Sequence, residues 1–158
     1  MTNQSKNTIN LLFVCHGNIC RSTMAEYVLK HMVAKRGMAE RFRINSAATS
    51  TEEIGNPVHR GSRSKLRREG IPVGDHRAVR MKKEDYGVYD YLIGMDKWNI
   101  TNMLRILGGD PDQKVCRLLD FTDHPRDIAD PWYTGDFDIT YDDICEGCNA
   151  FLDRLEGR

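Results

Sequence analysis

Short apolar runs alternate four times with helical patterns along this chain. Leu11–Cys15 is uninterrupted, as in a strand buried on both faces of a sheet, and further strand patterns follow at Phe42–Ala47, Tyr91–Met95 and Val115–Leu119. Successive parallel strands need crossover connections, which are usually helices. The alternation therefore predicts the α/β class, as a single-domain three-layer sandwich whose four-stranded parallel sheet carries helices on both faces.

The first predicted helix has one apolar face and a clear stop. Its apolar residues recur at helical spacing before Gly37, which is suited to a left-handed end: Ala25, Val28, Leu29, Met32 and Val33. We expect Ser22 or Thr23 to cap its start, and Glu26 completes a capping box with Thr23. Further helices are predicted over Pro57–Arg68, Asp96–Leu107 and Tyr141–Leu155.

Size and composition favour one ordinary globular domain. The chain has 158 residues, 40% of them hydrophobic, with 23 basic and 23 acidic side chains. We expect one domain over residues 11–158 after a polar extension at residues 1–10. The balanced charge disfavours nucleic-acid binding. Because no segment resembles a transmembrane helix or a secretory signal, we expect a cytoplasmic monomer without a membrane partner.

Two segments of opposite charge lie within this neutral chain. Residues 60–83 carry a net charge of +7, and residues 120–143 carry a net charge of −7. Such segments are usually solvated faces, but they can also orient a charged partner.

The turn after the first strand has the features of an anion site. A short loop that opens a helix points successive backbone N–H groups into one concavity, where the helix dipole adds positive potential. Arg21 can return to this loop and bind two oxygens of a tetrahedral oxyanion. Cys15, at the bottom, is expected to be a thiolate in this setting. The predicted substrate-binding residues here are His16, Gly17, Asn18, Ile19, Cys20 and Ser22.

A second motif lies in the acidic loop near the C-terminus. Pro131 favours an extended backbone at Asp130, which projects this carboxyl group from the loop. Beside a bound phosphate dianion the carboxyl group can stay protonated and serve as a general acid. Trp132 and Tyr133 are predicted to supply apolar walls for the substrate.

The five cysteines favour a reduced protein. Their number is odd, and a chain of this length needs no disulfide scaffold. Cys145 and Cys148 form a C-x2-C pair, but they lie on a predicted helix without a second pair, so we interpret them as packed thiols. We expect no metal and no cofactor.

Four motifs together resemble the low-molecular-weight protein tyrosine phosphatases. They are VCHGNICRS, SAATS, YLIGMD and DPWYTGDF, and the resemblance extends from Leu11 to Leu155. It implies a metal-independent phosphatase that acts on phosphotyrosine proteins through a cysteinyl-phosphate. In this scheme Cys15 is the nucleophile, Arg21 binds the phosphate and Asp130 is the general acid. Asn18 and Ser22 hold the loop and thiolate, while Asp96 and His76 have supporting roles.

Three residues depart from the family pattern. His16 replaces a small or apolar residue, Thr23 stands where proline is common, and Glu52 occupies the place of an aromatic wall. Other functions remain open on the same scaffold. A phosphoarginine phosphatase shares every catalytic residue, although Thr at the Ile19 position marks that branch. An arsenate reductase needs thiols in a mobile mid-chain segment, and residues 77–96 have none. A silent phosphoprotein-binding module is the third alternative.

Overall fold

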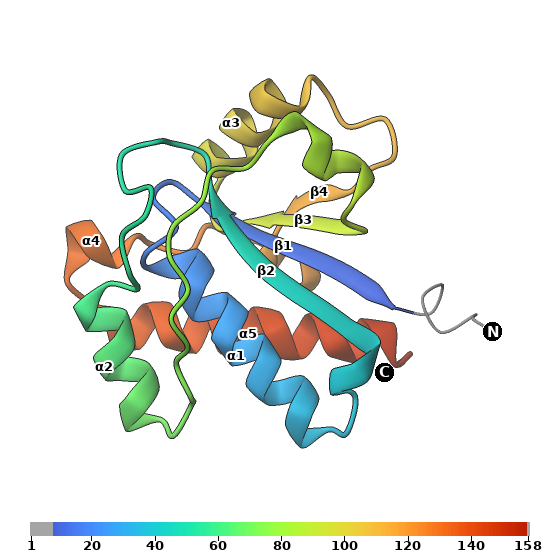
Figure 1. Ribbon diagram of the computed structural model, residues 1–158. Helices are drawn as coiled ribbons and strands as arrows, with labels where there is room; N and C mark the ends of the chain where they lie inside the picture. The colour runs from blue at the N-terminus through green and yellow to red at the C-terminus, as the bar shows by residue number, and fades with distance from the viewer. Residues whose placement is uncertain (1–7, 158) are drawn as a thin grey trace.

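The computed structural model describes residues 8–157, which form a four-stranded parallel sheet in the order β2, β1, β3, β4 (Figure 1). Its strands are β1 (Ile9–Cys15), β2 (Phe42–Ala48), β3 (Tyr91–Gly94) and β4 (Val115–Arg117). The carboxyl ends of the strands meet at one edge, where open α/β sheets bind ligands. Residues 1–7, which make up most of the predicted polar extension, lie outside the described residues.

Helices cover both faces of the sheet, so the predicted fold class is confirmed. Along β1, Leu11 and Phe13 pack on one face, while Leu12 and Val14 pack on the other. The first face is covered by three helices, α1 (Arg21–Lys35), α2 (Arg60–Arg68) and α5 (Phe137–Leu155). The second face is covered by α3 (Lys97–Leu107) and a 3-10 turn at Lys83–Gly87 (Figure 1).

The start of α1 differs from its prediction. The helix begins at Arg21 after Cys20, whose side chain forms no capping hydrogen bond. The Ser22 hydroxyl contacts the Cys15 thiol instead, and Thr23 Oγ1 donates to the carbonyl of Cys20. The predicted cap at Ser22 or Thr23 is therefore wrong, because the loop before the helix uses both hydroxyls.

Two other element boundaries differ from their predictions, because a local hydrogen bond sets each of them. The predicted strand Val115–Leu119 ends at Arg117, because Asp120 accepts the Arg117 backbone N–H at 2.8 Å and closes a 3-10 turn at Leu118–Phe121. The last helix starts earlier than the predicted Tyr141, because Asp136 caps it through the N–H of Ile139.

One further helix begins later than predicted, and one short helix was not predicted. Helix α2 begins at Arg60 rather than Pro57, with the His59 side chain as its cap, while Pro57 pairs with Arg77 in an isolated bridge. A short helix, α4 (Pro131–Thr134), was not predicted. It follows directly from Asp130, which accepts the N–H of Trp132 at 3.0 Å. The predicted Asp96–Leu107 helix is confirmed, with Asp96 as its cap.

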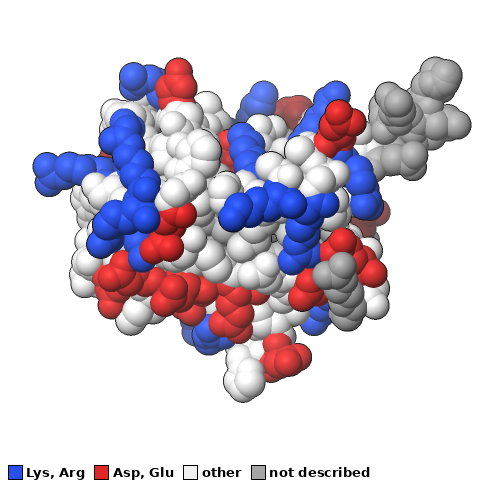
Figure 2. Space-filling view, turned by 90° about the horizontal axis from the view of Figure 1, so that it is seen from below, with Lys and Arg blue, Asp and Glu red and all other residues white. Residues whose placement is uncertain are grey.

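Opposite charges meet on the face seen from below in Figure 2. Lysine and arginine side chains gather at its left, where α2 lies in Figure 1, and acidic side chains follow its lower edge. Lys65 of α2 pairs with Asp138 of α5 at 2.9 Å, so the basic and acidic segments contact each other. Within residues 8–157, no helix is long and apolar enough to cross a bilayer.

The packing of α5 predicts that Gly147→Ala destabilises the fold. A Cβ at Gly147 would lie 2.5 Å from Cγ of the fully buried Leu118. Alanine favours helix by roughly 0.5–1 kcal/mol, but overpacking a core costs about 1–3 kcal/mol, so we expect a net loss of about 1–2 kcal/mol. Urea unfolding measures this loss. Gly87→Ala is the control, because its Cβ meets nothing within 4 Å, and an equal loss in both variants would contradict the argument.

Candidate active site

The loop between β1 and α1 wraps around the Cys15 thiol. The Cys15 side chain is at the end of β1, and the residue is 3% exposed. Its Sγ accepts the backbone N–H of Asn18 at 3.3 Å and lies 3.0 Å from the Ser22 hydroxyl. These contacts hold the sulfur at the point where the sheet edge meets the N-terminus of α1, and the positive end of a helix dipole attracts anions.

Asn18 holds this loop through every polar atom of its side chain amide. Its Nδ2 donates to Ser22 Oγ at 2.8 Å and to Ser46 Oγ at 2.9 Å. Its Oδ1 accepts from His76 Nε2 at 2.7 Å and from the Val79 N–H at 3.1 Å. Asn18 has a left-handed backbone (φ 62°), a conformation that asparagine tolerates better than most residues. The amide network therefore offsets the cost of this turn.

Behind Asn18, a buried carboxylate completes the network. Ser46 Oγ donates to Glu26 Oε1 at 2.5 Å, and Lys30 Nζ pairs with Glu26 Oε2 at 2.6 Å. Burial lowers the pKa of His76, although the Glu26 carboxylate opposes this effect. Neutral His76 can then donate through Nε2 to the loop. Neither Glu26 nor Ser46 is predicted from the sequence as a member of this site, because their contacts arise from the packing of α1 on β2.

Arg21 is buried and fixed from behind. The residue is 2% exposed, and its Nη1 donates to Asp96 Oδ2 at 2.6 Å and to the Ile128 carbonyl at 2.9 Å. Its Nη2 lies 3.5 Å from Asp130 Oδ2. Burial alone would lower the pKa of Arg21, but the negative charges of Cys15 and the two aspartates raise it above its usual value. The guanidinium is therefore a permanent positive charge beside the thiol.

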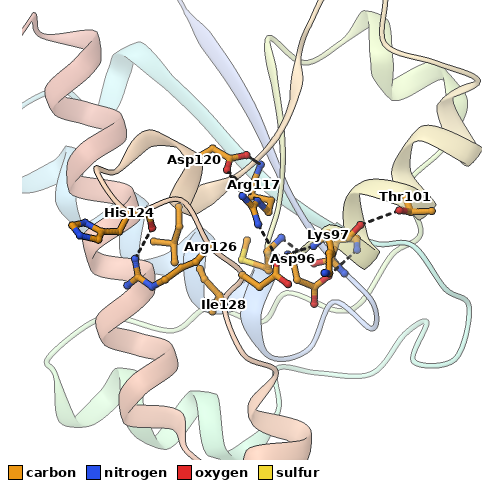
Figure 3. A network of polar contacts seen from close by, with 12 residues as sticks. Asp96, Lys97, Thr101, Arg117, Asp120, His124, Arg126 and Ile128 are labelled. Carbon is orange, nitrogen blue, oxygen red and sulfur yellow. Dashed lines mark hydrogen bonds and ion pairs between the residues drawn. The ribbon is translucent and has the colours of Figure 1, made fainter.

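The acidic loop that carries Asp130 is anchored to the sheet edge. Ile128 N–H donates to the Met95 carbonyl at 2.9 Å, just after β3. Figure 3 shows Asp96 and Ile128 close together, with Arg117 beside Asp120. Arg117 also pairs with Asp127 in the same loop at 3.0 Å. These contacts hold the loop so that Asp130 reaches the guanidinium side of the site.

One pocket of about 100 Å³ brings the predicted residues together. Its bottom is formed by Cys15 and Arg21, and its walls by residues of three loops: His16, Gly17, Ile19, Cys20, Glu52, Glu53, Asp130, Trp132 and Tyr133. Trp132 and Tyr133 are 57% and 84% exposed, so they form the rim. Asn18 and Ser22 lie behind the thiol, where they position it.

Acidic side chains form one part of the rim. His16 Nε2 lies 3.0 Å from Glu52 Oε2, and both side chains are at least half exposed. Glu53 also lines the pocket. It was not predicted as a site residue, although the adjacent Glu52 indicates that this loop is acidic. The two departures from the family pattern at positions 16 and 52 thus contact each other.

Burial raises the pKa of each of the four remaining cysteines. Burial raises the pKa of Cys20 to about 12. It also raises the pKa of Cys148 well above its usual value, because this residue is fully buried in the core under α5. In the part of the chain that the structure describes, no three His, Cys, Asp or Glu side chains are grouped as metal ligands.

A thiol inside an anion-binding loop, a buried arginine beside it and a carboxyl group at the rim define a cysteine-dependent phosphatase site. The family model for low molecular weight phosphotyrosine protein phosphatase matches residues 10–158. The chain belongs to this family of phosphoric monoester hydrolases.

Individual relatives agree with this assignment. The human low molecular weight phosphotyrosine protein phosphatase is 38% identical over 155 residues, which cover 93% of this chain and 96% of the human one. The crystal structure of YfkJ from Bacillus subtilis has a TM-score of 0.91 at 37% identity, covering 95% of this chain and 96% of YfkJ. That of the Drosophila arginine phosphatase has a TM-score of 0.84 at 27% identity, covering 92% and 97%.

Proposed function

We propose that the protein hydrolyses phosphotyrosine in proteins, with Cys15 as nucleophile, Arg21 as phosphate binder and Asp130 as general acid and base. The observation that supports this most directly is the Cys15 thiol, which accepts the Asn18 N–H and contacts the Ser22 hydroxyl at the bottom of the pocket. Both interactions hold the sulfur at the bottom of the pocket, where the proposed mechanism uses it as a thiolate to attack phosphorus.

In the first step the thiolate of Cys15 attacks phosphorus, so that an S–P bond forms and the P–O bond to the tyrosine ring breaks. Asp130 gives its proton to the leaving phenolate oxygen. The loop N–H groups and Arg21 stabilise the equatorial oxygens. Nη1 of Arg21 is occupied by Asp96 and Ile128, and one N–H of Nη2 points to Asp130 at 3.5 Å, so Nε and the second N–H of Nη2 are the groups left for two phosphate oxygens.

In the second step a water molecule attacks phosphorus and breaks the S–P bond. Asp130, now a carboxylate, accepts a proton from this water. Inorganic phosphate leaves, and Cys15 returns to the thiolate. Retention of the nucleophile, the arginine and the acid in one pocket argues against a silent binding module.

The pocket walls favour an aromatic phosphate ester. Ile19, Trp132 and Tyr133 offer apolar surface to a ring, at about 25 cal/mol per Å² of buried area. A phosphoserine side chain is shorter and gains no such contact. We therefore expect phosphotyrosine to be preferred over phosphoserine by a wide margin.

Phosphoarginine is the second candidate substrate. Glu52 and Glu53 line the pocket, and a carboxylate there can pair with the guanidinium of phosphoarginine. A structural relative of 27% identity is an arginine phosphatase, which shows that this scaffold can carry that activity. Ile19, however, presents an apolar side chain where that substrate needs a polar partner. Phosphotyrosine thus remains the favoured substrate.

Comparing phosphate release from phosphotyrosine, phosphoserine and phosphoarginine tests this preference. We expect kcat/KM to be highest for phosphotyrosine, and Ile19→Thr to shift the phosphotyrosine-to-phosphoarginine ratio by about tenfold toward phosphoarginine. Ile54→Thr is the control, because Ile54 is exposed and does not line the pocket. A parent enzyme that prefers phosphoarginine would overturn the proposed substrate.

The same chemistry indicates where the protein works. A catalytic thiol must stay reduced, which favours the cytoplasm. The pocket is built from a single chain, so the proposed reaction needs no second copy. We propose a cytoplasmic monomer whose partners are phosphotyrosine proteins rather than nucleic acids or membranes.

A further inference from the structure

An open groove of about 440 Å³ adjoins the catalytic pocket at the start of α2. The two share Ile19, Glu53 and Trp132 as lining residues, so a peptide leaving the pocket over this wall enters the groove. His59 fixes the wall, because its ring meets Trp132 edge-on at 5.6 Å and stacks on Phe137 at 5.5 Å.

The groove carries basic side chains that are not neutralised. Arg60 and Arg63 line it, and neither forms an ion pair within residues 8–157. Arg63 donates from Nη2 to the Val58 carbonyl at 3.3 Å. Further along α2 the situation differs, because Lys65 pairs with Glu69 and Asp138. The two guanidinium groups therefore have no carboxylate partner among residues 8–157.

Other polar groups of the groove leave this positive charge in place. His59 Nδ1 accepts the N–H of Gly61 at 3.0 Å, so this nitrogen is occupied within the chain. Glu53 adds one negative charge and accepts from Asn56 at 2.9 Å. Two arginines against one glutamate leave a net charge of +1. Glu52 lines the pocket but not the groove, so the mouth is acidic on one side and basic on the other.

We propose that this groove binds an acidic side chain of the substrate peptide, a few residues from the phosphotyrosine, through Arg60 and Arg63. The inference rests on the proposed phosphatase function. Guanidinium groups bind carboxylates through paired hydrogen bonds, and a residue of extended peptide advances roughly 3.3 Å. The groove thus selects among phosphotyrosine peptides by their flanking charge.

The test compares phosphotyrosine peptides that carry one Asp at each position near the phosphotyrosine with an all-Ala peptide. We expect at least one Asp position to raise kcat/KM by about fivefold to tenfold, which is the scale of a charge-assisted hydrogen bond at a partly exposed site. Arg60→Glu should abolish this gain. It should leave turnover of p-nitrophenyl phosphate unchanged, because that small ester does not reach the groove.

Arg67→Glu is the matched control, since it makes the same charge change on an exposed position of α2 outside the groove. Equal losses in both variants, or no Asp preference in the parent, would overturn the proposal. Failure to hydrolyse even p-nitrophenyl phosphate would refute the phosphatase function instead. In that case fluorescence anisotropy of labelled Asp and Ala phosphopeptides still tests the groove, with tighter binding of the Asp peptide as the expected result.

Discussion

Cys15→Ser is expected to abolish phosphatase turnover while binding of a tetrahedral oxyanion survives. Serine places a hydroxyl where the thiolate stood, and its high pKa removes the nucleophile at neutral pH. We expect kcat to fall by at least about 10⁴-fold, the scale of losing a covalent nucleophile. We expect the oxyanion to bind to backbone N–H groups of the loop and to Arg21, whose contact with Asp96 the substitution leaves in place.

Two measurements check this prediction together. Release of p-nitrophenol from its phosphate ester reports turnover, and calorimetric titration with tungstate reports oxyanion binding. Cys145→Ser is the control, because Cys145 lies on α5 away from the pocket. Retention of more than a tenth of the parent kcat by Cys15→Ser would show that no covalent cysteinyl-phosphate is required.

Asp130→Asn is expected to cost about 10²- to 10⁴-fold in kcat with poor leaving groups, because an amide has no proton to give to the leaving oxygen. Esters whose phenolate leaves without protonation should lose much less. The structure makes asparagine a conservative change here, since its side-chain oxygen can still accept the Trp132 N–H that caps α4.

A series of aryl phosphates with leaving groups of different basicity measures this dependence. Asp136→Asn is the matched control, because Asp136 caps α5 by the same type of contact and lies outside the pocket. If Asp130→Asn lowered kcat equally for every leaving group, the carboxyl group would be a structural support for Arg21 and α4 rather than the acid.

The sequence was sufficient to predict most residues of the loop around the Cys15 thiol, because they are contiguous in the chain. Cys15 and Arg21 stand at either end of one turn, and their residue types indicate anion binding wherever that turn is folded. Asp130 was predicted from a second motif far away in the sequence. It was expected near Cys15 because the loops at the carboxyl ends of parallel strands meet at one edge of the sheet. These predictions depended on local patterns and on one topological rule.

The polar network behind the loop could not be predicted from such local patterns. Glu26 fitted a capping box in the sequence, yet in the fold it accepts the hydroxyl of Ser46. Ser22 was predicted as a helix cap, yet its hydroxyl contacts the Cys15 thiol. For Glu26 a tertiary partner replaced the local one, and that partner depends on how α1 packs on β2. For Ser22 a contact within the loop replaced the helix cap.

The contacts of Arg21 also bear on how this protein acquires activity during folding. Its partners lie 75, 107 and 109 positions later in the chain, and Asn18 relies on partners 58 and 61 positions later. Contacts of such high sequence separation form late, because the entropy cost of closing a long loop comes before the contact can stabilise the chain. A buried guanidinium without its carboxylates is also strongly unfavourable. We therefore expect a growing chain to complete this site only after the final third of the polypeptide, which carries Ile128 and Asp130, has docked.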